Sequence, residues 1–305
     1  MFSQPRADPA TILAVDRSDA QDGSTRAAPR DFSSLLALEP HGPDTFVGVS
    51  PPYEWGRIYG GQVVAQALWA AGATVPPGRA VHSLHAYFIL GGRLDEPVRY
   101  EVDRVRNGRS FMTRRVVARQ SYGAILTLEA SFHVDEPGPD VETVRAPDDV
   151  PLPGELPEQG WGWMLERRPV PTAAGSARAT TWVRVDDSLG DDPVRHACAL
   201  AFATDTGTVS AVRLTHPRTG GDAHRPDDAF MGASLDHAVW FHRPVRSNGW
   251  LLIDVSCESL TGVRGLTIGR VFDEQRRHVA TLAQEALLRE RHVPSTVGIA
   301  DLSGT

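Results

Sequence analysis

A carboxylate inside an apolar segment is the residue of this chain that points most directly to chemistry. Asp205 ends the run Leu200-Ala-Phe-Ala-Thr-Asp, whose other side chains are mostly small or apolar. A carboxylate buried at the centre of a helix must be hydrogen-bonded or have a raised pKa, and either condition suits a group that takes a proton from water. Taken alone, an aspartate followed by Thr206 and Gly207 is also typical of a structural helix end.

Gln284 is a second polar residue with no obvious reason to face solvent. It lies in a strand-like segment that also contains Val279, Leu282 and Leu287. An amide donates and accepts hydrogen bonds, as does a hydroxyl such as that of Ser234, so both groups can orient a water molecule. Taken alone, Ser234 is equally compatible with a strand-end hydroxyl bonded to backbone.

The composition is that of a globular protein without a nucleic-acid partner. Of the 305 residues, 41% are hydrophobic and 23% charged, which is enough for one large core or two ordinary ones. All 31 basic residues are arginine, and the net charge is −7. Phosphate recognition usually accompanies a basic domain, so we expect no nucleic acid to bind.

Neither metals, cofactors nor membranes are indicated. The two cysteines, Cys198 and Cys257, form no paired metal-binding motif and no disulfide framework. The first thirty residues contain no long apolar run and carry acidic residues where a signal peptide would be basic. We therefore expect a cytoplasmic protein that needs no metal or cofactor and inserts into no membrane.

Proline content and periodicity divide the chain. Residues 1–30 lack periodicity and are expected to form a disordered leader, and 293–305 a loose tail. Residues 136–160 are rich in proline and are predicted to be a linker. Two units remain, at 31–135 and 161–292.

The two units repeat one another. Ala67–Val75 can be aligned with Ala201–Val209, and Ser83–Phe88 with Ser234–Phe241 after a two-residue insertion. In this alignment Ala71 stands where the second unit has Asp205. Each unit is then a helix followed by antiparallel strands, which predicts an α+β protein of two repeats.

The expected elements follow from spacing. Gly60 and Gly61 precede an alanine-rich segment in which Val64, Leu68 and Ala71 share one helical face. The second unit is expected to contain a helix near 193–213. Strands are expected at 98–105, 111–118, 124–132, 234–243, 250–258, 265–272 and 278–289.

Five blocks in a fixed order carry a resemblance to a known family. The chain resembles the type II acyl-CoA thioesterases, the thioesterase B family, over about residues 32–291. The blocks are Tyr59-Gly-Gly-Gln-Val-Val-Ala-Gln-Ala-Leu-Trp, Val81-His-Ser-Leu-His-Ala-Tyr-Phe, Gly108-Arg-Ser-Phe-Met-Thr-Arg-Arg-Val, Asp236-His-Ala-Val-Trp-Phe-His-Arg-Pro and Ala283-Gln-Glu-Ala-Leu-Leu-Arg.

This resemblance implies a tandem, double hot-dog fold in which each helix is wrapped by an antiparallel sheet. It implies hydrolysis of acyl-CoA to fatty acid and CoA, and a homo-oligomer of the double unit. It further implies that Asp205, Ser234 and Gln284 jointly hold the attacking water. The developing oxyanion needs donors, for which backbone N–H groups of Gly61 or Gln62 are candidates.

Other functions remain as alternatives. A double hot-dog enoyl-CoA hydratase or dehydratase needs an aspartate and a histidine a few residues apart on the helix, and no histidine follows Asp205 here. A non-catalytic acyl-binding module is the other alternative, and the Asp205, Ser234 and Gln284 set argues against it. His82, His85, His237 and His242 lie in aromatic strand segments and are expected to be structural.

Overall fold

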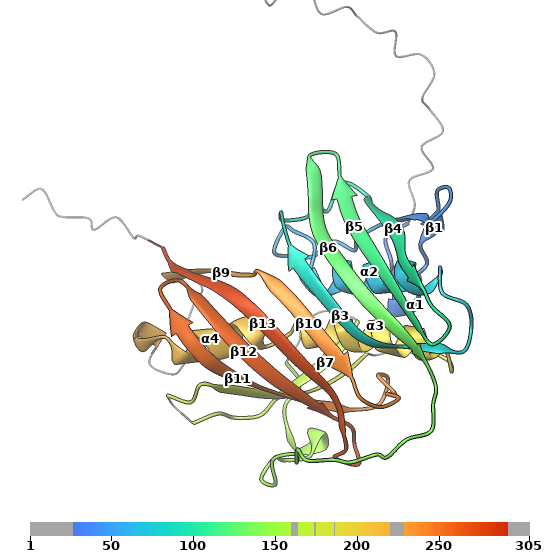
Figure 1. Cartoon of the computed structure of the whole chain (residues 1–305). Helices are drawn as coiled ribbons and strands as arrows, with labels where there is room; N and C mark the ends of the chain where they lie inside the picture. Colours follow the sequence, from blue (N-terminus) through green and yellow to red (C-terminus); the bar gives the residue numbers. More distant parts are fainter. Residues whose placement is uncertain (1–26, 160–163, 174, 186, 220–228, 292–305) are drawn as a thin grey trace, which may run out of the picture.

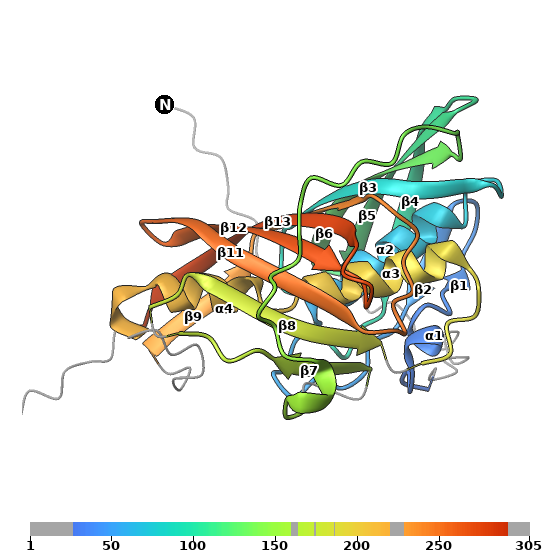
Figure 2. The ribbon, with the colours of Figure 1, turned by 90° about the horizontal axis from the view of Figure 1, so that it is seen from below.

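The strands of the protein form one antiparallel sheet that curls around its helices. The computed structural model describes residues 27–159, 164–173, 175–185, 187–219 and 229–291. The leader expected at 1–30 lies outside these residues except for its last four, and the tail expected at 293–305 lies wholly outside them. Within the described residues the sheet has 13 strands, and the helices lie along its inner side (Figures 1 and 2).

The first half places a short helix and two strands before its main helix. In chain order its elements are α1 (Phe32–Leu35), β1 (Glu39–Pro40), β2 (Thr45–Gly48), α2 (Gly60–Gly72), β3 (Arg79–Phe88), β4 (Val98–Asn107), β5 (Phe111–Gln120) and β6 (Gly123–Val134). Helix α2 begins at the predicted glycine pair, and nearly all of its side chains are buried.

Within the described residues, the second half follows the same plan with one more strand. In chain order its elements are the 3₁₀ turn η1 (Pro153–Glu155), β7 (Leu165–Pro169), β8 (Arg178–Val185), α3 (Pro193–Thr204), α4 (Thr208–Thr215), η2 (Pro217–Thr219), β9 (Phe230–Ser234), β10 (Asp236–Phe241), β11 (Leu251–Thr261), β12 (Arg264–Phe272) and β13 (His278–Glu290). Strands β7 and β8 precede the helices and were not predicted.

The two halves join through one pair of strands at the centre of the sheet. The strand order is β1-β2-β4-β5-β6-β3-β10-β13-β12-β11-β8-β7, and β9 pairs with β13. Strands β3 and β10 are antiparallel, with Ser83 opposite Trp240 and Tyr87 opposite Asp236. These are the segments that align between the two repeats, so the repeats meet across a local twofold relation. The predicted α+β class is confirmed.

The single helix predicted near 193–213 is in fact two helices. Helix α3 ends at Thr204 and α4 begins at Thr208. The break lies at Gly207, whose φ of 87° is in the left-handed region that side chains with a Cβ rarely adopt. The apolar spacing continues across this break, so periodicity alone predicts one helix.

The linker predicted at 136–160 crosses the surface of the second half and is anchored to it. Within its described part, up to residue 159, no α-helix or strand forms. Val150 and Leu156 are buried in a small cluster with Trp182, and the Trp182 indole N–H donates to the carbonyl of Pro151 at 2.8 Å. The boundaries of the two units at 31–135 and 161–292 stay a prediction.

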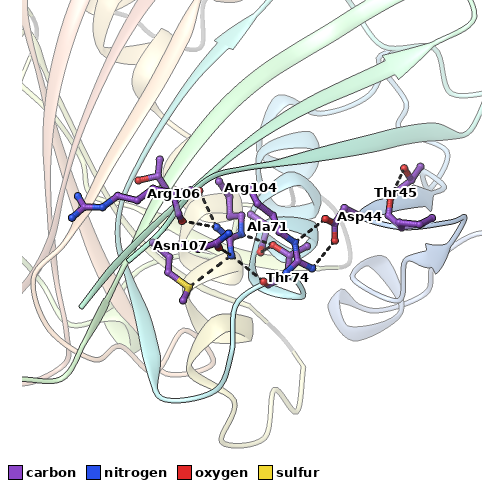
Figure 3. A network of polar contacts seen from close by, with 11 residues as sticks. Asp44, Thr45, Ala71, Thr74, Arg104, Arg106 and Asn107 are labelled. Atoms are coloured by element: carbon purple, nitrogen blue, oxygen red, sulfur yellow. Dashed lines mark hydrogen bonds and ion pairs between the residues drawn. The ribbon is translucent and has the colours of Figure 1, made fainter. Parts of the chain in front are cut away.

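A buried arginine closes the carboxyl end of α2. All five N–H groups of Arg114, which is fully buried, donate hydrogen bonds. They reach the hydroxyl and carbonyl of Thr74, the side chain of Asn107, and the carbonyls of Arg106 and Thr113, at 2.7 to 3.1 Å. Figure 3 shows Thr74, Arg106 and Asn107 gathered in this network. A cation at a helix carboxyl end also interacts favourably with the helix dipole.

We expect Arg114→Met to lower the free energy of unfolding by about 3 kcal/mol, because several buried carbonyl and hydroxyl groups lose their donor. Urea unfolding followed by circular dichroism measures the effect. Arg115→Met is the matched control, because Arg115 is exposed and pairs with Asp103 at the surface. The control should change the free energy of unfolding by less than about 1 kcal/mol. Equal effects of the two substitutions would contradict this account of Arg114.

Candidate active site

Asp205 lies where the end of α3 meets the beginning of α2. It is the C-cap residue of α3 and is only 9% exposed. Helices α2 and α3 pack side by side and run antiparallel. The start of α2 therefore lies against the end of α3. A Cβ on Gly61 would lie 2.5 Å from the carbonyl oxygen of Phe202, so this close approach requires glycine.

The first contact of Asp205 comes from the other half of the chain. The backbone N–H of Gly61 donates to Asp205 Oδ2 at 2.8 Å. Gly61 is the second residue of α2, where N–H groups have no partner within the helix. The positive end of the α2 dipole therefore faces the carboxylate.

The second contact comes from the sheet of the same half. The Ser234 hydroxyl, at the end of β9, donates to Asp205 Oδ1 at 3.1 Å. The Gln284 amide, on β13, donates to Ser234 Oγ at 2.6 Å. Gln284 is fully buried. The structure thus brings Asp205, Ser234, Gln284 and Gly61 together from four separate segments.

Burial shifts the acidity of this carboxyl group. Desolvation raises the pKa of Asp205 to about 6, and the hydrogen bonds from Ser234, Gln284 and Gly61 oppose part of that rise. Asp205 is therefore largely ionised at neutral pH yet able to hold a proton slightly below it. These properties are those of a general base.

Two residues that sequence reasoning did not select, Thr208 and His237, also contact the set, and a third, Thr204, contacts His237. Gln284 Nε2 donates to the Thr208 hydroxyl at 2.7 Å, and its Oε1 lies 2.6 Å from Nδ1 of His237. His237 Nε2 in turn lies 3.0 Å from the hydroxyl of Thr204. His237 is fully buried. Its neighbour in the sequence, Asp236, does not share this cluster and accepts from the backbone N–H of Glu285.

The other histidines considered lie apart from Asp205. His82 bonds to the Ser131 hydroxyl, and His242 bonds to the Thr281 hydroxyl. The ring of His85 packs edge-on against Trp240. Among the described residues, no group of three or more histidine, cysteine, aspartate or glutamate side chains is placed to hold a metal ion.

The two proposed oxyanion donors already have partners. The Gly61 N–H is bonded to Asp205, and the Gln62 N–H donates to the carbonyl of Tyr59 at 3.1 Å. The Gln62 side chain is buried and donates to the Ser50 hydroxyl. In this arrangement Gly61 holds the carboxylate, while Gln62 anchors the segment that precedes α2.

Asp205 and Ser234 open onto a pocket of about 580 Å³. Gly60 and the apolar side chains of Val63, Phe88, Ile125 and Val209 line this pocket. The exposed side chains of Trp55, Ile89 and Leu90 also border it. A carboxylate and a hydroxyl beside these apolar side chains can act on a polar bond carried by an apolar molecule.

Two family models match the chain. One is described as the acyl-CoA thioesterase N-terminal domain and matches residues 49–133, and the other as the acyl-CoA thioesterase C-terminal domain, matching 137–288. Together they cover most of both halves of the sheet and every residue of the Asp205 cluster.

Relatives and solved structures agree with these models. Acyl-CoA thioesterase 2 of Haemophilus influenzae is 31% identical over 281 residues, which is 84% of this chain and 96% of the relative. The crystal structure of an acyl-CoA thioesterase II from Mycobacterium marinum has a TM-score of 0.73 and 35% identity, covering 85% of this chain and 98% of that one.

A more distant structure supports the fold. A hot-dog protein from Alicyclobacillus acidocaldarius has a TM-score of 0.70 at 21% identity, covering 86% of this chain and 98% of that one. With antiparallel strands wrapped around the helices of each half, the predicted tandem hot-dog fold is confirmed.

The raised pKa of Asp205 predicts a specific stability profile. The pKa of this carboxyl group is higher in the folded than in the unfolded protein. The protein therefore loses folding stability as the pH rises from about 4 to 6. Asp205→Asn cannot titrate, so its stability relative to wild type should increase by up to about 3 kcal/mol between pH 4 and pH 7. Urea unfolding of both proteins at the two pH values measures this. A difference that does not change with pH would contradict the raised pKa.

Proposed function

The chain belongs to the acyl-CoA thioesterase family, and from this premise we propose that Asp205 activates the water molecule that hydrolyses the thioester of an acyl-CoA. The observation that carries the proposal is a buried carboxylate held by Gly61 and Ser234 where it lines a pocket, and burial raises the pKa of that carboxylate. A base with this acidity takes a proton from water at neutral pH and releases it again.

The reaction is a direct displacement at the thioester carbon. Asp205 removes a proton as the water oxygen bonds to that carbon, and the carbonyl oxygen becomes negative. Collapse of this intermediate re-forms the carbonyl and breaks the carbon–sulfur bond. The CoA thiolate leaves and takes up the proton that Asp205 removed from water, which restores the carboxylate, and the fatty acid is released. The Ser234 hydroxyl and the Gln284 amide orient the water together with Asp205.

The beginning of α2 is the part of the site suited to the oxyanion. The Gly61 N–H is bonded to Asp205, so we assign the oxyanion to the positive end of this helix as a whole and not to the Gly61 N–H alone. Gly60 lines the pocket, and a Cβ there would meet Asp205 Oδ2 at 2.8 Å. The absence of a side chain lets substrate approach the helix end.

The acyl group is expected to lie against the apolar wall of the pocket. Phe88 and Ile125 come from the first half of the chain, and Val209 comes from α4. An alkyl chain bound among these side chains leaves water, which favours binding. The first half thus contributes walls and a helix end, and the second half contributes the reacting groups.

We propose one working site in each chain. Ala71, the counterpart of Asp205 in the repeat alignment, is fully buried in α2 and cannot take a proton from water. The carboxyl end of that helix is closed by Arg114, which bonds to Thr74. A cation bonded to carbonyl oxygens, and not a carboxylate, therefore lies at the end of α2.

Asp205→Asn should lower kcat by about 100-fold or more, because it removes basicity and keeps the shape of the side chain. Release of free CoA thiol from a panel of acyl-CoAs measures it. Ser234→Ala and Gln284→Ala should each cost less, and their effects should be non-additive because both groups hold the same water. A folded Asp205→Asn protein with near-normal turnover would overturn the assignment.

We propose that the chain assembles with copies of itself. Strands β3 and β10 carry aromatic side chains on the outer face of the sheet, where Tyr87 is 62% and Trp240 is 36% exposed. Exposed aromatic side chains in the middle of a sheet are common at interfaces between subunits.

Light scattering coupled to size-exclusion chromatography should therefore give a mass that is a multiple of 33.1 kDa. Trp240→Arg, which places a charge on this face, should shift the protein toward the mass of a single chain. The matched control is Val263→Arg, because Val263 is similarly exposed, at 40%, but lies in the turn between β11 and β12. A wild-type protein of single-chain mass would contradict this proposal.

A reducing, cytoplasmic location is also proposed. Cys198 and Cys257 are both free thiols, and burial raises the pKa of the Cys198 thiol, which keeps it protonated and unreactive. Within the described residues, no helix is both long enough and apolar enough to cross a membrane.

A further inference from the structure

His237 is fully buried beside the proposed catalytic set, and its ring nitrogens bond to Gln284 and Thr204 and not to Asp205 or Ser234. It lies on β10, with its ring between Gln284 of β13 and Thr204 at the end of α3. Burial lowers the pKa of His237 to about 4, so the ring is neutral at neutral pH. A neutral imidazole has one N–H donor and one acceptor nitrogen.

The partners of Gln284 decide which nitrogen carries the proton. Its Nε2 group donates to Thr208 and Ser234, so both amide hydrogens are used. Its Oε1 can only accept, and it faces His237 Nδ1 at 2.6 Å. Nδ1 must then be the donor, and Nε2 must accept from the hydroxyl of Thr204.

We propose that His237 is a positioning residue, and that its Nδ1–H fixes the orientation of the Gln284 amide and thereby directs the Ser234 hydroxyl to Asp205. This inference rests on the proposed function. The hydrogen bonds then run in one direction, from Thr204 through His237, Gln284 and Ser234 to the carboxylate. This direction is consistent with Asp205 as the last acceptor, because an ionised carboxylate can only accept hydrogen bonds.

The opposite tautomer would reverse the amide. With the proton on Nε2, His237 would donate to Thr204, whose own hydroxyl proton can reach the carbonyl of Ala201 at 3.2 Å. Nδ1 would then accept from the Gln284 NH₂ group, and Oε1 would face Ser234. Ser234 would donate to that oxygen in place of Asp205. The carboxylate would lose a hydrogen bond that lowers its pKa.

The first test observes the tautomer directly and needs no activity. Long-range ¹⁵N–¹H correlation spectra of wild-type protein labelled with ¹⁵N-histidine distinguish a protonated Nδ1 from a protonated Nε2. The His237 signals are those lost in His237→Asn. A protonated Nδ1 is the expected result. A protonated Nε2 overturns the inference and leaves the role of Asp205 intact.

The second test uses turnover. His237→Leu removes the Nδ1–H donor and puts an apolar side chain in its place. The value of kcat should therefore fall about tenfold, while KM changes by less than about twofold. The apparent pKa of the acidic limb of the kcat profile should rise, because Asp205 loses the Ser234 proton. His237→Asn, whose amide nitrogen lies near the position of Nδ1, should recover most of the loss. Thr204→Val should add nothing to His237→Leu.

Tyr59 also titrates beside Asp205, but it does not affect the acidic limb of the kcat pH profile. Tyr59 faces Asp205 from the segment before α2, and burial together with the Asp205 charge raises the pKa of Tyr59 well above its usual range. His242→Leu is the matched control, because His242 bonds to Thr281 away from the site and should leave the pH profile unchanged.

Two outcomes of the turnover test would overturn the inference. One is a folded His237→Leu protein with the wild-type kcat and pH profile. The other is a loss of kcat with an unmoved acidic limb and no recovery in His237→Asn, which indicates a purely structural histidine. Failure of the proposed function would give a different result, because Asp205→Asn would then retain its activity whatever the His237 tautomer is.

Discussion

The hydrogen bond between the Gly61 N–H and Asp205 Oδ2 is the contact on which the rest of the site depends. It spans 144 residues of sequence and joins the start of one repeat's helix to the end of the other's. It forms only because glycine lets the helices approach until a Cβ would overlap the carbonyl of Phe202. The sheet fixes that approach, since strands β3 and β10 join the halves in one register.

Burial and hydrogen bonding act on Asp205 in opposite directions. Removal from water favours the neutral acid, whereas a helix end and two polar side chains favour the carboxylate. The balance leaves Asp205 with a pKa of about 6, close to neutral pH. It also lowers the stability of the folded protein, which a purely structural residue would not do. Arg114 shows the opposite solution in the first repeat, where a buried charge is fully satisfied by fixed acceptors and performs no chemistry.

Chemical mismatch with neighbours determined what could be predicted from the sequence. Asp205 and Gln284 stand out because each is polar within an apolar segment. The role of Gly61 as a donor to Asp205 was hidden because every residue except proline carries a backbone N–H. His237 was expected to be structural because a histidine in an aromatic strand segment usually is, and its contact with Gln284 is visible only in the fold. The break at Gly207 was missed because apolar spacing continues across it.

Direct attack by water, with Asp205 as the base, is the central claim about the mechanism. A single turnover in H₂¹⁸O, with enzyme in excess over acyl-CoA, tests it when the fatty acid and the Asp205 peptide are both analysed by mass spectrometry. The account predicts ¹⁸O in the fatty acid and none in Asp205. Label in the Asp205 carboxylate would contradict it, because Asp205 would then have been acylated and released by hydrolysis at its own carbonyl.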